Sequence, residues 1–364
     1  MGLYTGIARP LLFWLEAERA HRLALATAAA LAPLAGPLRH LVGVDDPRLA
    51  MDVAGLHFPN PLGLAAGFDK SGTGIAVLSA LGFGAIEIGS VSVDPSRGNP
   101  QPRLFRLPDD RAILVHYGLP NDGIPAIAAR LQQTRLPVPL GINIVKTNRG
   151  RGTPPETAEQ IIAEYTEGVR LMAPCADYLM LNLSCPNTED GRDFFAEAGN
   201  LRTCLSALAD LALPCPVFLK VSPLGGIATI ERLLEAAEPH DFVSGFMFNL
   251  PPVKPEGLTT PPAVWRDRPG AVAGPPAAAL AETCIRETYR RMNRQRYAIV
   301  GAGGIGSAAD AYAKIRMGCS LVQMLTALVY EGPLVVRRIL TGLALLLERD
   351  GFAHVADAVG ADCG

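Results

Sequence analysis

The segment 298–324 reads AIVGAGGIGSAADAYAKIRMGCSLVQM and contains one complete strand–helix–strand unit. An apolar run at Ala298–Val300 precedes a glycine-rich turn, a helical pattern at Ala308–Met317 and a second apolar run at Leu321–Met324. Continuous apolar runs separated by helices are typical of parallel strands that are covered on both faces. The segment therefore predicts a parallel α/β sheet.

The same alternation extends over most of the chain. Six further apolar runs precede this unit, at Leu62–Ala66, Ala85–Ile88, Leu140–Ile144, Tyr178–Leu183, Val217–Val221 and Gly245–Asn249. Other helical patterns lie at Thr157–Met172, Leu201–Leu213, Ala277–Met292 and Leu334–Arg349. Eight such units predict a (β/α)₈ TIM barrel more readily than an open sheet. The run MDVAGLHF at 51–58 is expected to form a hairpin that closes the barrel floor.

Composition narrows the class of protein. The 364 residues carry 33 basic and 35 acidic side chains, so the net charge is −2, and no nucleic-acid partner is expected. Hydrophobic residues make up 49%, which excludes a disordered chain. The seven cysteines are an odd number without a C-x-x-C pair. This cysteine pattern argues against a disulfide framework and against a structural zinc site, so no bound metal is expected. It favours a reducing compartment.

Residues 1–42 differ in composition from the rest of the chain, because they are rich in Leu and Ala with scattered arginines. Their longest charge-free stretch, Leu23–Leu38, has 16 residues and two prolines, which is too short to span a membrane. Two helices with apolar faces are expected, roughly at 10–31 and 34–42. The pattern alone favours packing on the barrel. The alternative is a patch that lies on a membrane surface or opens to a lipid-soluble ligand.

Polar residues and glycines gather where the predicted strands end. In such barrels the chemistry lies at the C-terminal ends of the strands. They are Gly67, Lys70, Ser90, Asn143, Lys146, Asn182–Asn187, Lys220, Asn249, Gly303, Gly304 and Thr326. Amides and lysines with few carboxylates suit an electron-rich, anionic ligand. Turn formation would explain Gly67 and Gly303. Turn formation does not explain Lys220, which lies near the C-terminal end of the predicted strand Val217–Val221, because a lysine is almost never buried without a partner.

The glycine-rich stretch VGAGGIG at 300–306 follows the seventh predicted strand and precedes a helix. Glycines there let backbone N–H groups approach a phosphate at the helix N-terminus. The loops after strands seven and eight are the usual phosphate site of a TIM barrel, and Thr326 could add a hydroxyl. The position predicts a phosphate-binding site.

The stretch NLSCPNT at 182–188 brings amides, hydroxyls and a thiol to the exit of the fourth strand. Cys185 is the catalytic candidate, because a thiol with thiolate character can act as a general base. Two alternatives stay open on residue type alone. Cys185 could be an inert buried cysteine, and His116 could be the base instead.

Several of these stretches resemble dihydroorotate dehydrogenases in order and spacing. They are AAGFDK (65–70), GFGAIEIGSV (82–91), GNPQPRLFRL (98–107), GINI (141–144), NLSCPNT (182–188), LKVSP (219–223), GAGGIGS (301–307) and SLVQ (320–323). The stretch ARPLLFWLEAERAHRLAL (8–25) is similar to the extension of the membrane-associated, quinone-reducing class of that family. The resemblance covers about residues 3–345. It implies one FMN at the strand C-termini, dihydroorotate on one flavin face and quinone arriving under the N-terminal helices.

The resemblance also implies roles for single residues. Cofactor contacts are implied for Ala66, Gly67, Ser90, Asn143, Asn182, Lys220, Gly274, Gly303, Gly304 and Thr326. Substrate contacts are implied for Lys70, Asn182, Asn187 and Asn249, and Cys185 stands at the base position. Lys220 would place a positive charge beside the flavin pyrimidine, where reduction builds negative charge.

The chain departs from the family pattern at several positions. Cys185 stands where the quinone-dependent class carries serine, as in the soluble classes. On the substrate side, Val115 replaces an asparagine and Leu250 replaces a threonine. Each lost amide or hydroxyl would leave a ligand group unpaired, at ~1–3 kcal/mol each.

The expected function is FMN-dependent oxidation of dihydroorotate to orotate with electrons passed to quinone, at the cytoplasmic side of a membrane as a peripheral protein. Residues 1–44 would form the membrane- and quinone-associated segment, and residues 45–364 the FMN-binding barrel. One alternative is a diverged paralogue that acts on another small cyclic substrate. A second is a flavin-binding, membrane-associated protein without turnover, against which Cys185 and Lys220 argue.

Overall fold

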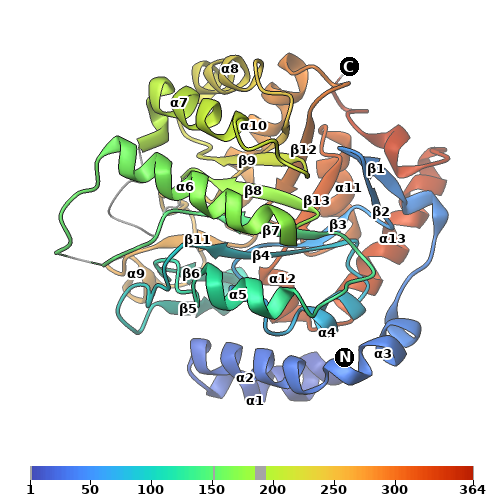
Figure 1. Cartoon of the computed structure of the whole chain (residues 1–364). Coiled ribbons are helices and arrows are strands. Elements are labelled where there is room, and N and C mark those ends of the chain that lie inside the picture. The colour runs from blue at the N-terminus through green and yellow to red at the C-terminus, as the bar shows by residue number, and fades with distance from the viewer. Residues whose placement is uncertain (1, 151, 185–193, 364) are drawn as a thin grey trace.

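The barrel is the centre of the molecule. The computed structural model describes residues 2–150, 152–184 and 194–363. Eight parallel strands close into a barrel, and helices surround it (Figure 1). Around the barrel the strands follow the order β3 (Leu62–Leu64), β4 (Ala85–Val91), β7 (Leu140–Ile144), β8 (Tyr178–Asn182), β9 (Val217–Val221), β10 (Val243–Phe248), β12 (Ala298–Ala302) and β13 (Leu321–Met324), and β13 pairs with β3. The predicted (β/α)₈ TIM barrel is confirmed, with all eight predicted strands in place.

The strands are apolar along their length because both of their faces are covered. Every residue of β3, β4, β7 and β8 is buried. The covering α-helices are α4 (Ile75–Ala80), α5 (Ile124–Leu131), α6 (Ala158–Met172), α7 (Ala198–Ala209), α8 (Gly226–Ala237), α10 (Ala278–Arg291), α11 (Ala308–Arg316) and α13 (Val335–Asp350). The short helix α12 (Thr326–Glu331) directly follows β13. α7 begins and ends earlier than the predicted Leu201–Leu213.

A small antiparallel sheet, which the sequence did not predict, stands beside the strand C-termini. Its strands are β5 (Leu104–Leu107), β6 (Ala112–Val115) and β11 (Ala271–Ala273), with β6 in the middle. β11 ends the Pro-rich loop after β10, in which α9 (Pro262–Trp265) also lies. Leu107, Leu114 and Val272 form its own buried cluster. The pairing of β6 with β11 joins residues far apart in the chain, so no local pattern announces it.

The predicted hairpin is confirmed. β1 (Met51–Val53) pairs with β2 (Leu56–Phe58) in antiparallel register. The ring of Phe58 lies 6.5 Å from the ring of Tyr178, the first residue of β8. The hairpin therefore covers the N-terminal end of the barrel, as expected.

The N-terminal helices lie outside the barrel, along one side of the molecule (Figure 1). They are α1 (Arg9–Trp14), α2 (Ala17–Ala30) and α3 (Ala35–Val42). The prediction of one helix over 10–31 is wrong, because the backbone is extended at Leu15 and a new helix begins at Ala17. The carboxylate of Glu16 caps that helix by accepting from the backbone N–H groups of Glu18 and Arg19, both at 2.9 Å.

None of the helices in the described part of the chain is both long and apolar enough to cross a membrane by itself. Residues 17–30 and 32–42 together would pass on length and composition, but the two helical stretches are bent by 61° relative to each other.

Candidate active site

A cavity of about 310 Å³ opens at the C-terminal ends of the barrel strands and continues between the small sheet and the N-terminal helices. This volume lies in the range of small-molecule and cofactor sites. The predicted site residues that line it are Ala66, Gly67, Lys70, Ser90, Asn182, Lys220, Asn249, Gly274, Gly303, Gly304 and Thr326. Asn143 lies behind this lining and accepts a hydrogen bond from Ser90. Cys185 and Asn187 lie outside the described residues.

A chain of hydrogen bonds fixes the polar side chains at the ends of β4, β7 and β8. Asn182 donates from Nδ2 to Ser90 Oγ at 3.0 Å, and Ser90 donates to Asn143 Oδ1. Asn249 donates from Nδ2 to Asn182 Oδ1 at 3.0 Å and to the Ser184 carbonyl at 2.9 Å. The side-chain oxygens of the three asparagines are thereby occupied by protein donors, since Leu250 N–H donates to Asn249 Oδ1 at 2.9 Å. Asn249 uses both Nδ2 hydrogens in these bonds, whereas Asn182 uses one and keeps the other for a ligand that accepts a hydrogen bond.

Lys70 supplies a cation at the same end of the cavity. Its Nζ donates to the Gly67 carbonyl at 2.7 Å and lies 3.8 Å from the centroid of the Tyr117 ring. Burial lowers the pKa of Lys70 to about 8, although the carboxylates of Asp69 and Glu18 oppose that shift. A desolvated ammonium group of this kind gains most from an anionic partner. Lys70 therefore suits a ligand carboxylate.

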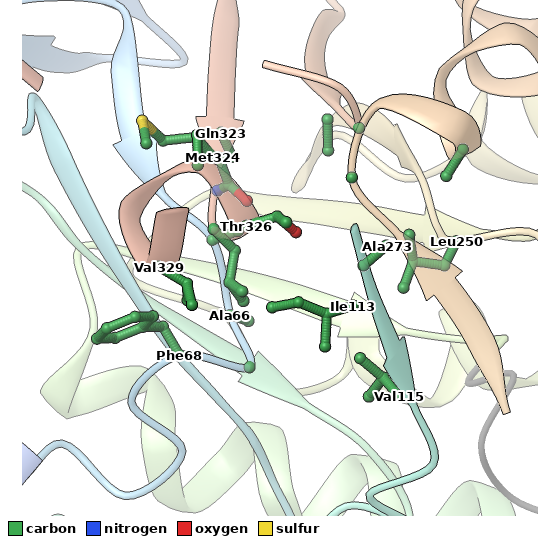
Figure 2. Close-up of a pocket in the computed structure, with 18 of the residues that line it drawn as sticks. Ala66, Phe68, Ile113, Val115, Leu250, Ala273, Gln323, Met324, Thr326 and Val329 are labelled. Atoms are coloured by element: carbon green, nitrogen blue, oxygen red, sulfur yellow. The ribbon is translucent and has the colours of Figure 1, made fainter. Parts of the chain in front are cut away.

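Backbone rather than side chains lines the cavity where β12 and β13 end. Gly274, Gly303 and Gly304 have φ of 118°, 85° and 75°, a region that favours glycine. A Cβ added to Gly304 would lie 3.0 Å from Ala278 Cβ. Thr326 begins α12 and its hydroxyl faces the cavity (Figure 2). Free backbone N–H groups at such a turn suit a phosphate.

An apolar wall faces these polar groups. Ile113 and Val115 of β6, Ala273 of β11 and Leu250 in the loop after β10 all line the cavity. Figure 2 shows Ile113 and Val115 projecting from the same side of β6. The two positions at which the chain departs from the family pattern on the substrate side therefore both present hydrocarbon to the cavity.

The far end of the cavity runs between α2 and the small sheet. Its lining includes Phe13, His21, Arg106 and Tyr330. Burial, together with the charge of Lys70, lowers the pKa of His21 to about 3, so this ring is neutral at pH 7. Arg106 donates to the carbonyls of Phe13 at 3.2 Å and Leu15 at 2.9 Å. Sequence reasoning missed these residues, because only the docking of the N-terminal helices brings them to the cavity.

Sequence reasoning also missed Glu87 and Gln323, which stand in two of the quoted stretches. Their neighbours in the sequence are apolar, and nothing in the spacing marks them as site residues. Gln323 lines the cavity, and Glu87 lies behind it in the barrel with no exposed surface.

The alternative base His116 does not belong to the cavity lining in the part of the chain that the structure describes. It contacts Asn99, whose Nδ2 lies 3.0 Å from His116 Nε2 and donates to the His116 carbonyl at 3.0 Å. These contacts support a structural role for His116. No group of His, Cys, Asp and Glu among the described residues has the arrangement of a metal site.

Comparisons with known proteins agree with this geometry. The family model described as dihydroorotate dehydrogenase matches residues 48–347. The dihydroorotate dehydrogenase (quinone) of Mycobacterium tuberculosis strain H37Rv is 41% identical over 357 residues, which are 97% of each chain. The protein of the same name from Sphingopyxis alaskensis is 42% identical over 362 residues, 98% of this chain and 96% of that protein. The crystal structure of DHODH from Eimeria tenella in complex with ferulenol superposes with a TM-score of 0.83 at 29% identity, covering 95% of both chains.

Proposed function

Because the chain belongs to the dihydroorotate dehydrogenase family, we propose that it binds FMN, oxidises dihydroorotate to orotate and passes the electrons to a quinone. The observation that carries this proposal is that one cavity joins a backbone cradle for phosphate, a buried lysine and amide groups for a small anion, and an apolar channel to the N-terminal helices.

The residues present fit FMN. Gly303 and Gly304 line the cavity with positive-φ backbone and carry no side chain, which suits the phosphate group. Lys220 at the end of β9 is buried and lines the cavity, where a positive charge would favour the reduced flavin. When bound, FMN supplies the two-electron acceptor for the hydride that leaves the substrate.

Lys70, Asn182 and Asn249 would hold the substrate. Dihydroorotate has a carboxylate for the Lys70 ammonium group and carbonyl oxygens for the amide donors. Its oxidation removes a hydride from one ring carbon and a proton from the neighbouring carbon, next to a carbonyl. We assign the proton to the thiolate of Cys185, which follows the described Ser184 in the chain.

The apolar channel and the surface around it support a quinone acceptor and a membrane surface. Exposed hydrophobic side chains gather on the first helices, with Leu3 79%, Trp14 85%, Leu34 56% and Leu41 73% exposed. Exposed apolar side chains on amphipathic helices are typical of helices that lie in a lipid interface. Residues 1–44 would thus attach the protein peripherally to the cytoplasmic side of a membrane, and residues 45–364 would carry the chemistry.

Stopped-flow mixing of the purified protein with dihydroorotate tests the proposal. We expect FMN to co-purify in about stoichiometric amount and its absorbance to bleach on mixing, with turnover restored by a quinone. If the protein carries FMN but the flavin absorbance does not change on mixing with dihydroorotate, dihydroorotate is not the substrate. A colourless protein that cannot be reconstituted would contradict the cofactor.

A second candidate function rests on Val115 and Leu250. Both residues line the cavity with hydrocarbon side chains, so this part of its wall offers no polar partner to a dihydropyrimidine ring. A diverged enzyme that acts on a more apolar small cyclic carboxylate would fit this wall. Flavin bleaching by such a compound, faster than by dihydroorotate, would identify it.

A further inference from the structure

Glu87 of β4 is a fully buried carboxylate in the barrel interior, with 0% of its surface exposed. Asn143 donates from Nδ2 to Glu87 Oε1 at 2.9 Å. Gln323 donates from Nε2 to Glu87 Oε2 at 2.7 Å, and the Tyr178 hydroxyl donates to the same oxygen at 3.2 Å. Three donors from three different strands thus converge on one side chain.

Both carboxyl oxygens of Glu87 act as acceptors here, Oε1 for Asn143 and Oε2 for Gln323 and Tyr178. Glu87 therefore decides which way each amide next to it is turned. Asn143 must direct its NH₂ group at Glu87, which leaves its Oδ1 for Ser90. Gln323 must also direct its NH₂ group at Glu87, so its carbonyl oxygen is forced to the opposite side.

The carbonyl oxygen of Gln323 lies on the cavity side. Figure 2 shows the carboxamide of Gln323 with its oxygen toward the cavity, beside Thr326. This Oε1 is buried and has no hydrogen-bond partner among the described residues. Gln323 as a whole is 4% exposed. A buried acceptor without a partner is rare in folded proteins, so it points to a ligand that donates a hydrogen bond there.

The position of Gln323 in the chain limits which ligand group can reach it. Thr326, at the phosphate cradle, is three residues further on, which spans at most roughly 10 Å of backbone. In FMN the ribityl chain is bonded directly to the phosphate and carries hydroxyl donors. The flavin ring has an N–H donor as well, but it lies at the opposite end of the molecule.

We propose that Gln323 is an FMN-binding residue whose carbonyl oxygen accepts a hydrogen bond from a ribityl hydroxyl, and that Glu87 is the positioning residue that turns this oxygen into the cavity. The proposal rests on the proposed FMN cofactor but not on the identity of the substrate. It adds to the site two residues that sequence reasoning missed.

The rate at which the holoenzyme releases FMN tests it, because free flavin fluoresces strongly and its appearance after dilution can be followed without substrate. We expect Gln323→Met, which keeps the side-chain length and removes the acceptor, to release FMN ~10-fold faster, equivalent to about 1.4 kcal/mol. Glu87→Gln should have a similar effect, because a glutamine there lets the amide of Gln323 turn around. If the two residues act through one hydrogen bond, the double variant should also stay near 10-fold rather than reach roughly 100-fold.

Glu164→Gln is the matched control. Glu164 of α6 is 9% exposed and accepts from the backbone N–H of Thr147 at 2.9 Å, but it does not line the cavity. Its FMN release should equal that of the wild type. Thermal unfolding of each variant separates a loss of stability from a loss of FMN contact. Should Glu87→Gln fail to fold, Gln323→Met still decides the contact.

The visible spectrum distinguishes the ribityl chain from the ring. The ribityl chain is not conjugated with the flavin ring, so the absorption bands of Gln323→Met should stay at the wild-type wavelengths. A band shift would place the contact on the ring and overturn the ribityl assignment. Unchanged release from a folded Gln323→Met holoenzyme would overturn the contact itself and leave the FMN proposal standing, whereas a wild type without FMN would refute the cofactor.

Discussion

Arg103, in the loop before β5, and Glu18 of α2 form a bidentate ion pair in which Nη2 donates to Oε1 at 2.8 Å and Nε to Oε2 at 3.1 Å. Each side chain is 8% exposed. Arg103 also donates to the carbonyls of Arg97 at 2.5 Å and Asn99 at 2.8 Å. The charges of both partners influence Lys70, so the pair joins the N-terminal helices to the substrate end of the cavity.

Glu18→Ala should loosen α2 from the barrel. The variant leaves the Arg103 guanidinium buried without its carboxylate, which costs roughly 3–5 kcal/mol. Hydrogen exchange of the α2 amides measures the loss. Glu16→Ala is the control, because it removes only the cap of the same helix, at about 1 kcal/mol. Equal exchange in both variants would show that the ion pair does not hold the helix.

The ion pair between Arg103 and Glu18 should stop stabilising α2 at low pH, when Glu18 becomes protonated. Burial raises the pKa of Glu18, but the hydrogen bonds and charge of Arg103 outweigh it and leave the pKa below its ordinary value. A carboxyl group with a depressed folded pKa stabilises above its unfolded pKa and loses this contribution as the pH falls through the folded pKa. Protection of α2 should therefore be constant from pH 7 to about 5 and decline below about 4. In Glu18→Gln the decline should be absent or smaller.

Lys70 should give the binding of dihydroorotate an alkaline limb. Because burial lowers its pKa to about 8, the ammonium group that pairs with the substrate carboxylate is lost above that pH. The KM should rise up to tenfold per pH unit above pH 8. Lys70→Met should raise the KM roughly 10–100-fold and remove the limb.

Lys314→Met is the control for Lys70. Lys314 is also buried, with 2% exposed, and its Nζ lies 3.0 Å from Glu282 Oε1. It does not line the cavity. Lys314→Met should keep the alkaline limb. If the KM of Lys70→Met still rose above pH 8, the alkaline limb would belong to a group other than Lys70.

Val115→Asn should lower the KM for dihydroorotate, because it puts an amide on the apolar wall of β6. A recovered hydrogen bond is worth about 1 kcal/mol, or roughly fivefold. Val115→Ala, which opens the same space without an amide, should not improve binding. Unchanged or weaker binding by a folded Val115→Asn would mean that Val115 does not meet the substrate.

Cys185→Ala should keep FMN and slow its reduction by dihydroorotate by roughly 10²–10⁴-fold, the usual contribution of a general base. The rate of flavin reduction in Cys185→Ser should lie between those of the wild type and Cys185→Ala. Its pH optimum should shift upward, because an alcohol is a weaker acid than a thiol. Cys215→Ser, a half-buried cysteine outside the cavity lining, controls for thiol loss. Single-turnover reduction from pH 6 to 10 measures all three. A wild-type rate in Cys185→Ala would exclude the thiol as the base.

Trp14→Asp should reduce sedimentation of the protein with liposomes, because Trp14 is 85% exposed at the end of α1. Leu224→Asp is the control: Leu224 is 40% exposed and directly precedes the start of α8, a helix that Figure 1 shows on the side of the molecule opposite α1 and α2. Flavin reduction by dihydroorotate should be normal in both variants. Equal loss of lipid binding in both would show that the N-terminal helices are not the membrane face.

Some parts of the molecule were readable from local sequence. The strands could be predicted because both faces of a parallel barrel strand are buried, which leaves runs such as 140–144 without polar alternation. Lys70, Lys220 and the glycines at 303 and 304 could be predicted because they lie in the C-terminal part of such strands or in the loops that follow them, where barrel sites form. The break at Leu15 was missed, since the apolar pattern continues across it and only the cap by Glu16 ends one helix and begins the next.

Local sequence is sufficient to predict the barrel, the end of the barrel that carries the site and the residue types offered to a ligand, because these depend on short-range periodicity and on chain direction. How those residues are used depends on the tertiary structure. Glu87 faces inward toward Gln323, which is 236 residues away in the chain, and Arg103 meets Glu18 across 85 residues. Contacts of this kind depend on which strands and helices become neighbours when the barrel closes and α2 docks. No local pattern predicts these contacts, and they set the direction of each amide and the docking of α2 on the barrel.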